Sequence, residues 1–197
     1  MLVDSHCHLE YEGLVDDQPG VLARARAAGV GAFLNISTKR SEWEQVVATA
    51  EREPDVFASI GIHPHHADEH ADLSEDDLAT AAGHPRVIGL GETGLDYDYD
   101  RSDRAVQQRL FRRHIAVSRQ LDLPVIIHTR DAEDDTLAIL SDEMAKGPFP
   151  ALIHCFTASA EFGNAVLDLG LSISISGIAT FKNATDLADF ATRIPED

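Results

Sequence analysis

The chain has 197 residues, of which 44% are hydrophobic and 25% are charged. This composition is typical of a soluble globular protein and excludes a largely disordered chain. The 34 acidic residues outnumber the 16 basic ones, for a net charge of −18, which argues against a broadly basic surface that holds nucleic acid by many phosphate contacts. We interpret the acidity as an adaptation to high salt, where screening weakens repulsion among carboxylates. The alternative is a substrate that is not a long polyanion.

The chain has no apolar run of the roughly 20 residues that span a bilayer, and the N-terminus carries Asp4 where a leader would be basic and apolar. We therefore expect a cytoplasmic protein with no membrane contact, and the sequence suggests no obligate protein partner. Cys7 and Cys155 are the only cysteines, and we expect them to be reduced and buried.

The first predicted strand covers residues 1–8 and ends in two histidines. Alternate residues of a strand face the same side, so His6 and His8 point the same way, about 7 Å apart at Cα. We expect Leu2 and Val3 to bury the start of this strand. Two imidazoles on one face can bind one metal ion, although an isolated His-x-His is more often a pair of ordinary histidines.

Strand and helix patterns then alternate along the chain without a long linker or a repeat. The predicted strands are 1–8, 32–36, 56–60, 87–92, 125–127, 151–153 and 171–175, and the predicted helices are 19–28, 43–50, 74–82, 102–121, 131–145, 159–169 and 183–192. This alternation predicts a parallel α/β fold. We expect a single domain over residues 1–197, with a capping box of Ser41 and Glu44 ahead of the second helix.

Three later strands also run into a metal-capable side chain, namely Glu92, His128 and His154. The carboxyl ends of parallel strands are where barrel enzymes carry their chemistry, whereas a doubly wound sheet binds ligands at one switch point. Functional ends on many strands therefore favour a TIM-barrel-like (β/α) barrel. Seven strands are visible and the eighth is apparently missing, so we expect the domain to be incomplete at its C-terminus.

At this point the sequence resembles the TatD family of metal-dependent deoxyribonucleases, within the amidohydrolase-like metal-dependent hydrolases. The matching motifs follow family order along the whole chain: Asp4–His8, Gly61–His65, Gly89–Tyr97, Pro124–Arg130, His154–Phe156, Ser176–Ile178 and Phe181–Asn183.

The resemblance implies two divalent metal ions. His6 and His8 would bind the first, Glu92 would bridge both, and His128 and His154 would bind the second. Such a pair activates a water and clamps the oxygens of a phosphodiester, and the resemblance implies DNA as the substrate. The family is usually discussed with magnesium, but four imidazoles and one carboxylate suit zinc or manganese better. The resemblance also implies an eighth strand whose aspartate completes the metal site as general base. That segment is absent here, so we expect a fragment or a degenerate protein of uncertain activity.

Four further residues are predicted to contact substrate. His63 and His65 follow the third strand in a loop, Arg130 follows His128 by two residues, and Lys182 is one of three lysines. Asp96 can orient a ligand or cap a turn. Hydrolysis of a small ester, lactone or amide is the alternative activity, and an inactive metal-binding fragment is the non-enzymatic alternative.

Overall fold

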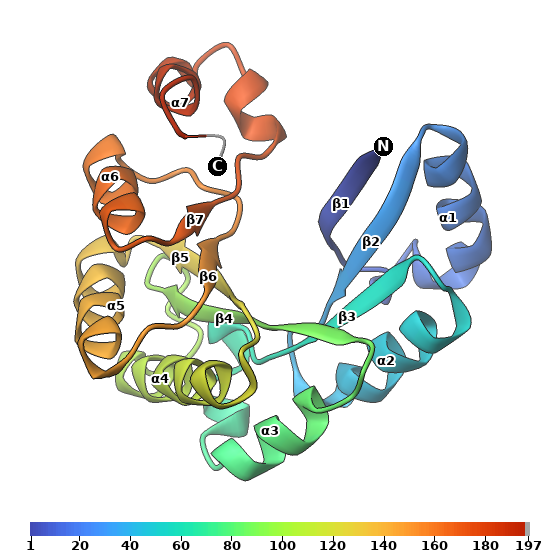
Figure 1. Cartoon of the computed structure of the whole chain (residues 1–197), viewed down its shortest axis with the longest axis horizontal. Coiled ribbons are helices and arrows are strands. Elements are labelled where there is room, and N and C mark those ends of the chain that lie inside the picture. The colour runs from blue at the N-terminus through green and yellow to red at the C-terminus, as the bar shows by residue number, and fades with distance from the viewer. Residues whose placement is uncertain (196–197) are drawn as a thin grey trace.

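The computed structural model describes residues 1–195, in which seven parallel strands form one curled sheet of order β1 to β7 (Figure 1). The strands are β1 Leu2–Cys7, β2 Val30–Ile36, β3 Val56–Ile60, β4 Val87–Asp96, β5 Val125–Arg130, β6 Ala151–Ile153 and β7 Ser172–Ile173. Each strand pairs in parallel with the next one along the chain. The strand order never reverses, so the sheet advances in one direction and curls as a barrel does.

The helices lie on the outside of this curled sheet (Figure 1). They are α1 Gln18–Ala27, α2 Trp43–Arg52, α3 Glu75–Ala82, α4 Arg104–Leu121, α5 Glu133–Lys146, α6 Ala160–Asp168 and α7 Thr185–Ala191, with short 3₁₀ turns η1 Val15–Asp17, η2 Arg40–Glu42, η3 Pro64–His66, η4 Asp68–His70 and η5 Gly177–Thr180. None of the helices in residues 1–195 combines the length and the hydropathy that a membrane-spanning helix needs.

One predicted helix cap is wrong, although α2 begins at Trp43 as expected. The Ser41 and Glu44 capping box does not form, because the 3₁₀ turn η2 precedes α2. The Glu42 carboxylate instead accepts hydrogen bonds from the backbone N–H and the hydroxyl of Thr38, at 2.8 and 2.9 Å. The loop after β2 is thereby fixed by a side chain that sequence spacing did not single out. Ser74, by contrast, caps α3 in a capping box with Asp77.

The apolar core fills the space between the sheet and the helices in two clusters. One packs α1, α2 and α3 on the first strands, with Leu22, Val46 and Leu78 fully buried. The other packs α4, α5 and α6 on the later strands around Phe111 and Phe156. Burial of these side chains stabilises each strand–helix unit and leaves the carboxyl ends of the strands at one rim.

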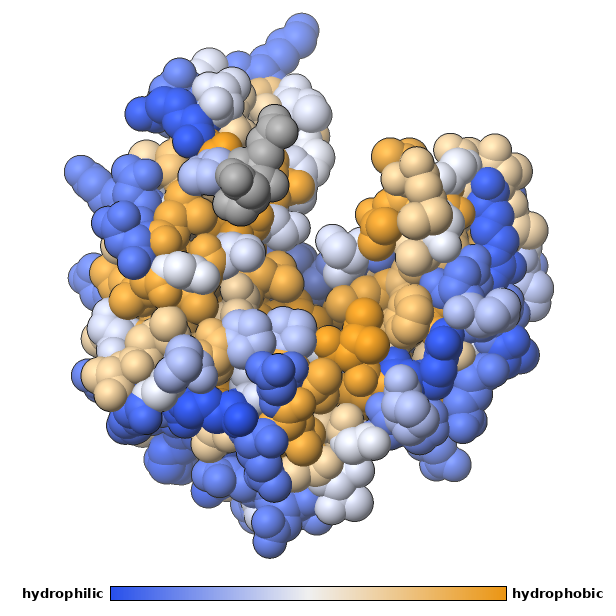
Figure 2. All heavy atoms as spheres, in the orientation of Figure 1, coloured by the Kyte–Doolittle hydropathy of each residue, from blue (hydrophilic) through white to orange (hydrophobic). Residues whose placement is uncertain are grey.

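The sheet is open between its first and last strands. Within residues 1–195, the outer edges of β1 and β7 have no strand partner, and Figure 2 shows the surface hollowed between the two arms. The expectation that the start of β1 is buried is therefore wrong: Leu2 and Val3 are 62% and 59% exposed. The predicted barrel-like fold is confirmed as a curled sheet of seven strands, and an eighth strand is not seen in this range.

Candidate metal centre

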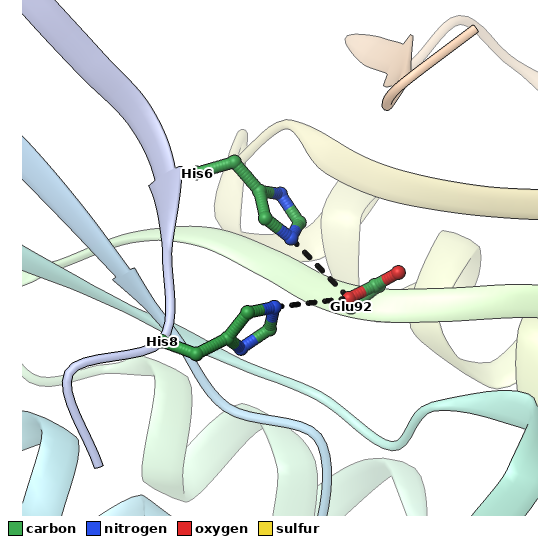
Figure 3. A group of neighbouring side chains, drawn as sticks. All are labelled: His6, His8 and Glu92. Atoms are coloured by element: carbon green, nitrogen blue, oxygen red, sulfur yellow. Dashed lines mark ion pairs between the residues drawn. The ribbon is translucent and has the colours of Figure 1, made fainter. Parts of the chain in front are cut away.

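Glu92 lies at the centre of a cluster of histidines, and each of its carboxylate oxygens faces different ones. Glu92 Oε2 lies 3.3 Å from His6 Nε2 and 3.8 Å from His8 Nε2. Figure 3 shows these two imidazoles pointing from β1 toward Glu92 on β4. The side chains of Glu92 and His6 are 5% and 13% exposed, so the arrangement is largely shielded from water.

Glu92 Oε1 faces three other histidines, His128 on β5, His154 after β6 and His63 after β3. It lies 3.0 Å from His128 Nδ1, 3.4 Å from His154 Nε2 and 3.6 Å from His63 Nε2. The predicted ligands His6, His8, Glu92, His128 and His154 therefore come together at one rim of the sheet, as their shared position at strand ends predicted.

A local irregularity in β4 aims Glu92 at this cluster. The pairing of β4 with β5 passes from Leu90 opposite Val125 to Thr93 opposite Ile127, so the register shifts around Gly91 and Glu92. Such a bulge turns a side chain away from regular alternation. The Ser59 hydroxyl donates to the Gly91 carbonyl at 2.6 Å, and the Glu92 N–H donates to the Ser37 carbonyl at 3.0 Å.

Glycine in β4 is required where this strand approaches β5. Gly94 has a φ of +135°, and a Cβ there would lie 2.0 Å from the carbonyl oxygen of His128. Only glycine fits both that backbone conformation and that distance. The close approach sets the spacing between the strands that carry Glu92 and His128.

Neighbouring groups orient two of the histidines. His8 Nδ1 donates to the carbonyl of Ile36 at 3.1 Å, which leaves Nε2 facing Glu92 with its lone pair available. His128 Nε2 lies 2.9 Å from Asp96 Oδ2, and the same oxygen lies 2.9 Å from His65 Nε2. Asp96 is fully buried, and its carboxylate links His128 on β5 to His65 in η3.

Burial and charge shift the pKa values of the cluster in opposite directions. Burial lowers the pKa of His63 to about 3 and that of His154 to about 4. Burial acts against charge at His128 as well, but hydrogen bonds to Asp96 and Glu92 raise its pKa to about 9. The pKa of Glu92 is held well below its usual value, because the histidines outweigh the effect of burial. The cluster therefore presents an ionised carboxylate at Glu92 and neutral imidazoles at His63 and His154, whereas His128 would have to lose its proton to bind a metal.

The surroundings of His6 also fit a metal ion, independently of the distances to Glu92. Both ring nitrogens of His6 are buried and lack a hydrogen-bond partner among the residues that the structure describes, although Nε2 lies close to Glu92. An unsatisfied buried polar atom is costly, and a divalent ion between imidazole and carboxylate satisfies both. Two groups have ligand atoms within 4.8 Å of one another: His6, His8 and Glu92, and His63, Glu92 and His128.

The predicted substrate residues have different surroundings. His63 lies against Glu92 inside the cluster, and His65 is held at its edge by Asp96. Arg130 Nε pairs with Asp98 Oδ2 at 3.2 Å. Lys182 is exposed between η5 and α7, and it forms no hydrogen bond or ion pair with residues 1–195.

Sequence reasoning missed three positioning residues. Ser37 and Ser59 are fully buried and fasten the bulge around Glu92. His114 on α4 is fully buried, and its Nε2 accepts the N–H of Ile62 at 3.2 Å, which fixes the loop before His63. Nothing in the spacing of these residues marks them, because their partners are backbone groups of distant strands.

Comparisons with known proteins agree with this geometry. The family model described as TatD related DNase matches residues 3–197. The metal-dependent hydrolase YcfH of Escherichia coli K12 is 42% identical over 199 residues, which cover all of this chain and 74% of YcfH. The 3'-5' ssDNA/RNA exonuclease TatD of Salmonella typhimurium is 32% identical, over all of this chain and 75% of that protein.

A solved structure shows the same fold. The TatD homologue YjjV of Escherichia coli K12 superimposes with a TM-score of 0.89 at 28% identity, over 98% of this chain and 75% of YjjV. With the matching family model and the identity to YcfH, this likeness settles the family. The chain belongs to the TatD family of metal-dependent hydrolases.

Proposed function

We propose that this chain hydrolyses phosphodiester bonds of DNA, within one hydrolase domain over residues 1–197. The observation that carries the proposal is the division of Glu92 between two groups of histidines, since a carboxylate with an imidazole group at each oxygen is suited to bridge two cations. The Salmonella typhimurium relative, whose name describes an exonuclease of single-stranded DNA and RNA, supports the choice of substrate.

His6 and His8 would hold one divalent ion with Glu92, and His128 and His154 would hold the other. When bound, such a pair supplies positive charge for the phosphate oxygens and a water that ionises near neutral pH. Magnesium, manganese and zinc are the ions to test, and the histidine-rich donor set favours zinc or manganese. His63 lies within 3.6 Å of the same Glu92 oxygen as His128 and His154, so it can serve as a ligand or meet the substrate.

Substrate phosphate would be met by the cationic and hydrogen-bonding groups at the rim. His65 is half-buried at the edge of the cluster, and the Arg130 guanidinium is exposed, with only its Nε side directed to Asp98. A guanidinium can bind phosphate through two parallel N–H groups. Lys182 is a further proposed contact.

The test is hydrolysis of a 5'-labelled single-stranded DNA oligonucleotide by the purified chain with manganese, magnesium or zinc, and with EDTA. We expect metal-dependent cleavage that Glu92→Gln abolishes and that the peripheral change His66→Ala leaves intact. A parallel panel of esters and lactones tests the alternative activity. Turnover of that panel with no cleavage of DNA would contradict the proposal.

A further inference from the structure

We propose that Tyr99 is a stacking platform for an unpaired base of single-stranded DNA beside the candidate metal centre. The inference rests on the proposed function and specifies how the substrate is held. Tyr99 is 50% exposed, so part of its ring is open to solvent. A planar ring of this kind offers a face to any base that is not already stacked in a duplex.

The ring of Tyr99 is coupled to the cluster through Asp96. The Tyr99 N–H donates to Asp96 Oδ1 at 3.1 Å, while Asp96 Oδ2 lies 2.9 Å from both His65 and His128. The Tyr99 and His65 rings meet edge to face, with 5.3 Å between their centroids and 85° between their planes. One buried carboxylate thus fixes the position of the exposed ring relative to a proposed metal ligand.

Two arginines flank the same ring. The guanidinium carbon of Arg130 lies 4.9 Å from the centroid of Tyr99, and that of Arg101 lies 5.2 Å from it. Arg130 also pairs with Asp98, whereas the Arg101 side chain has no carboxylate partner among residues 1–195. A base on the ring would bring its own phosphate within reach of these cations.

The negative net charge of the chain favours base stacking over phosphate contacts as the source of affinity for single-stranded DNA. The chain carries a net charge of −18, and Asp98 and Asp100 lie next to Tyr99 in the sequence, so a long polyanion gains little from the general field here. Stacking on an aromatic ring does not depend on net charge, and it needs a base with a free face. The arrangement therefore selects single strands and frayed ends over duplex.

Tyr11 provides a useful contrast on the other side of the cluster. It is 44% exposed, but its ring is already stacked on His8, with 4.4 Å between centroids and 11° between planes. One face of Tyr11 is thus taken by a proposed ligand. Tyr99 meets His65 only at an edge, and its half-exposed ring is covered by the mobile guanidinium groups of Arg130 and Arg101, so a base would stack on the ring by displacing one of these groups.

The experiment measures binding of a fluorescein-labelled single-stranded octanucleotide by fluorescence anisotropy, with EDTA present to prevent cleavage. Replacing Tyr99→Ala should raise the Kd by about 5- to 150-fold, the range for loss of one base–aromatic stack. Tyr99→Phe keeps the ring and should stay within about twofold of the unaltered chain. Arg101→Ala should weaken binding, and the matched control Arg109→Ala, at an exposed arginine on α4, should not.

An oligonucleotide of the same length with abasic sites distinguishes stacking from charge. Loss of affinity on Tyr99→Ala should vanish with the abasic strand, because there is no base to stack. Equal Kd values for the Tyr99→Ala variant and the unaltered chain on the normal strand would overturn the platform, as would no binding at all. Thermal melts establish that each variant is folded, and the exposed position of Tyr99 makes a large change in stability unexpected.

Hydrolysis of the same octanucleotide, measured separately with metal, keeps the two proposals apart. Binding that depends on Tyr99 without any cleavage would support the platform and contradict the nuclease activity. Cleavage with binding that is indifferent to Tyr99 would do the reverse.

Discussion

The imidazole of His6 on β1 lies parallel to that of His154 after β6, with 3.6 Å between ring centroids and 11° between ring planes. The contact joins the two sides of the open sheet through side chains. Burial lowers the pKa of His154 to about 4, so this ring is neutral at physiological pH and can stack without repulsion. Both rings also face Glu92, so a metal ion bound between them would link the two sides of the sheet and stabilise the fold.

We expect manganese or zinc to raise the thermal midpoint of the chain and EDTA to reverse the effect. When the concentration of free ion is about 100 times its Kd for the folded chain, binding stabilises the fold by about 2.7 kcal/mol. Differential scanning calorimetry with and without metal measures this. A midpoint that does not move at any metal concentration would show that the orphaned nitrogens of His6 do not mark an ion site.

Glu92→Ala should abolish binding of a metal pair, because this carboxylate alone faces both histidine groups. His66→Ala is the matched control, since His66 lies in the same loop as His65 but pairs with Glu69 at 3.0 Å. Elemental analysis of the purified variants gives the stoichiometry. Equal losses of metal in the two variants would show that Glu92 has no special part in binding the metal pair.

Gly94→Ala should both destabilise the chain and weaken metal binding. Its Cβ would lie 2.0 Å from the His128 carbonyl at a φ that side chains rarely adopt, and overpacking of this kind costs roughly 1–3 kcal/mol. Gly177→Ala is the control, because a Cβ there meets nothing within 4 Å. Urea unfolding compares the two variants, and similar unfolding free energies would mean that β4 and β5 can move apart.

Glu143 on α5 gives a pH prediction away from the rim. Burial opposes its charge, but Lys146, Arg119 and Arg112 lower its pKa to about 2. Because the pKa of Glu143 is lower in the folded chain, its ionised carboxylate stabilises the fold at pH values above about 4.5, the ordinary pKa of a glutamate. This contribution is lost as the pH falls toward 2. Removing the charge deprives three partly exposed cations of their shared carboxylate, which lowers the free energy of unfolding.

Thermal melts of Glu143→Gln across pH 3–7 check this behaviour. The deficit relative to the unaltered chain should be largest near pH 7 and should shrink below about pH 4.5. Glu44→Gln, at an exposed position on α2, should show little deficit at any pH. A deficit for Glu143→Gln that is constant across the range would contradict the assignment of its charge.

Stability should also rise as potassium chloride increases from dilute buffer toward molar concentration. Screening weakens repulsion within a chain of net charge −18. Melting curves at several salt concentrations test the interpretation of the acidic surface as a salt adaptation. A midpoint that is flat or falls would favour the alternative that the acidity reflects a small substrate.

The sequence predicts most strands and the meeting of the candidate ligands, because both depend on local patterns. Short β-branched runs give β3 and β6 with the bounds expected, Val56–Ile60 and Ala151–Ile153. Side chains at the carboxyl ends of parallel strands must meet at one rim, whatever the details of packing. The fold class by itself therefore predicts that Glu92 and His128 lie close together.

The rest depends on contacts between strands that no local pattern encodes. Two glycines within six residues, Gly91 and Gly94, favour a turn after Glu92. The strand β4 nevertheless continues to Asp96, because its C-terminal residues pair with β5. The exposure of Leu2 reflects the unpaired edge of β1, which an apolar strand pattern does not reveal.

The fastening of Glu92 by Ser37 after β2 and Ser59 on β3 has a consequence for the order of assembly. Residues 2–8 carry His6 and His8, but their acidic partner is directed toward them only when three consecutive strands have docked and the bulge of β4 has formed. His128 lies on β5 and His154 directly follows β6, so both depend on strands further along the chain. We therefore expect a metal ion to bind tightly only after β1 to β6 have paired, and to slow unfolding without nucleating the early part of the sheet.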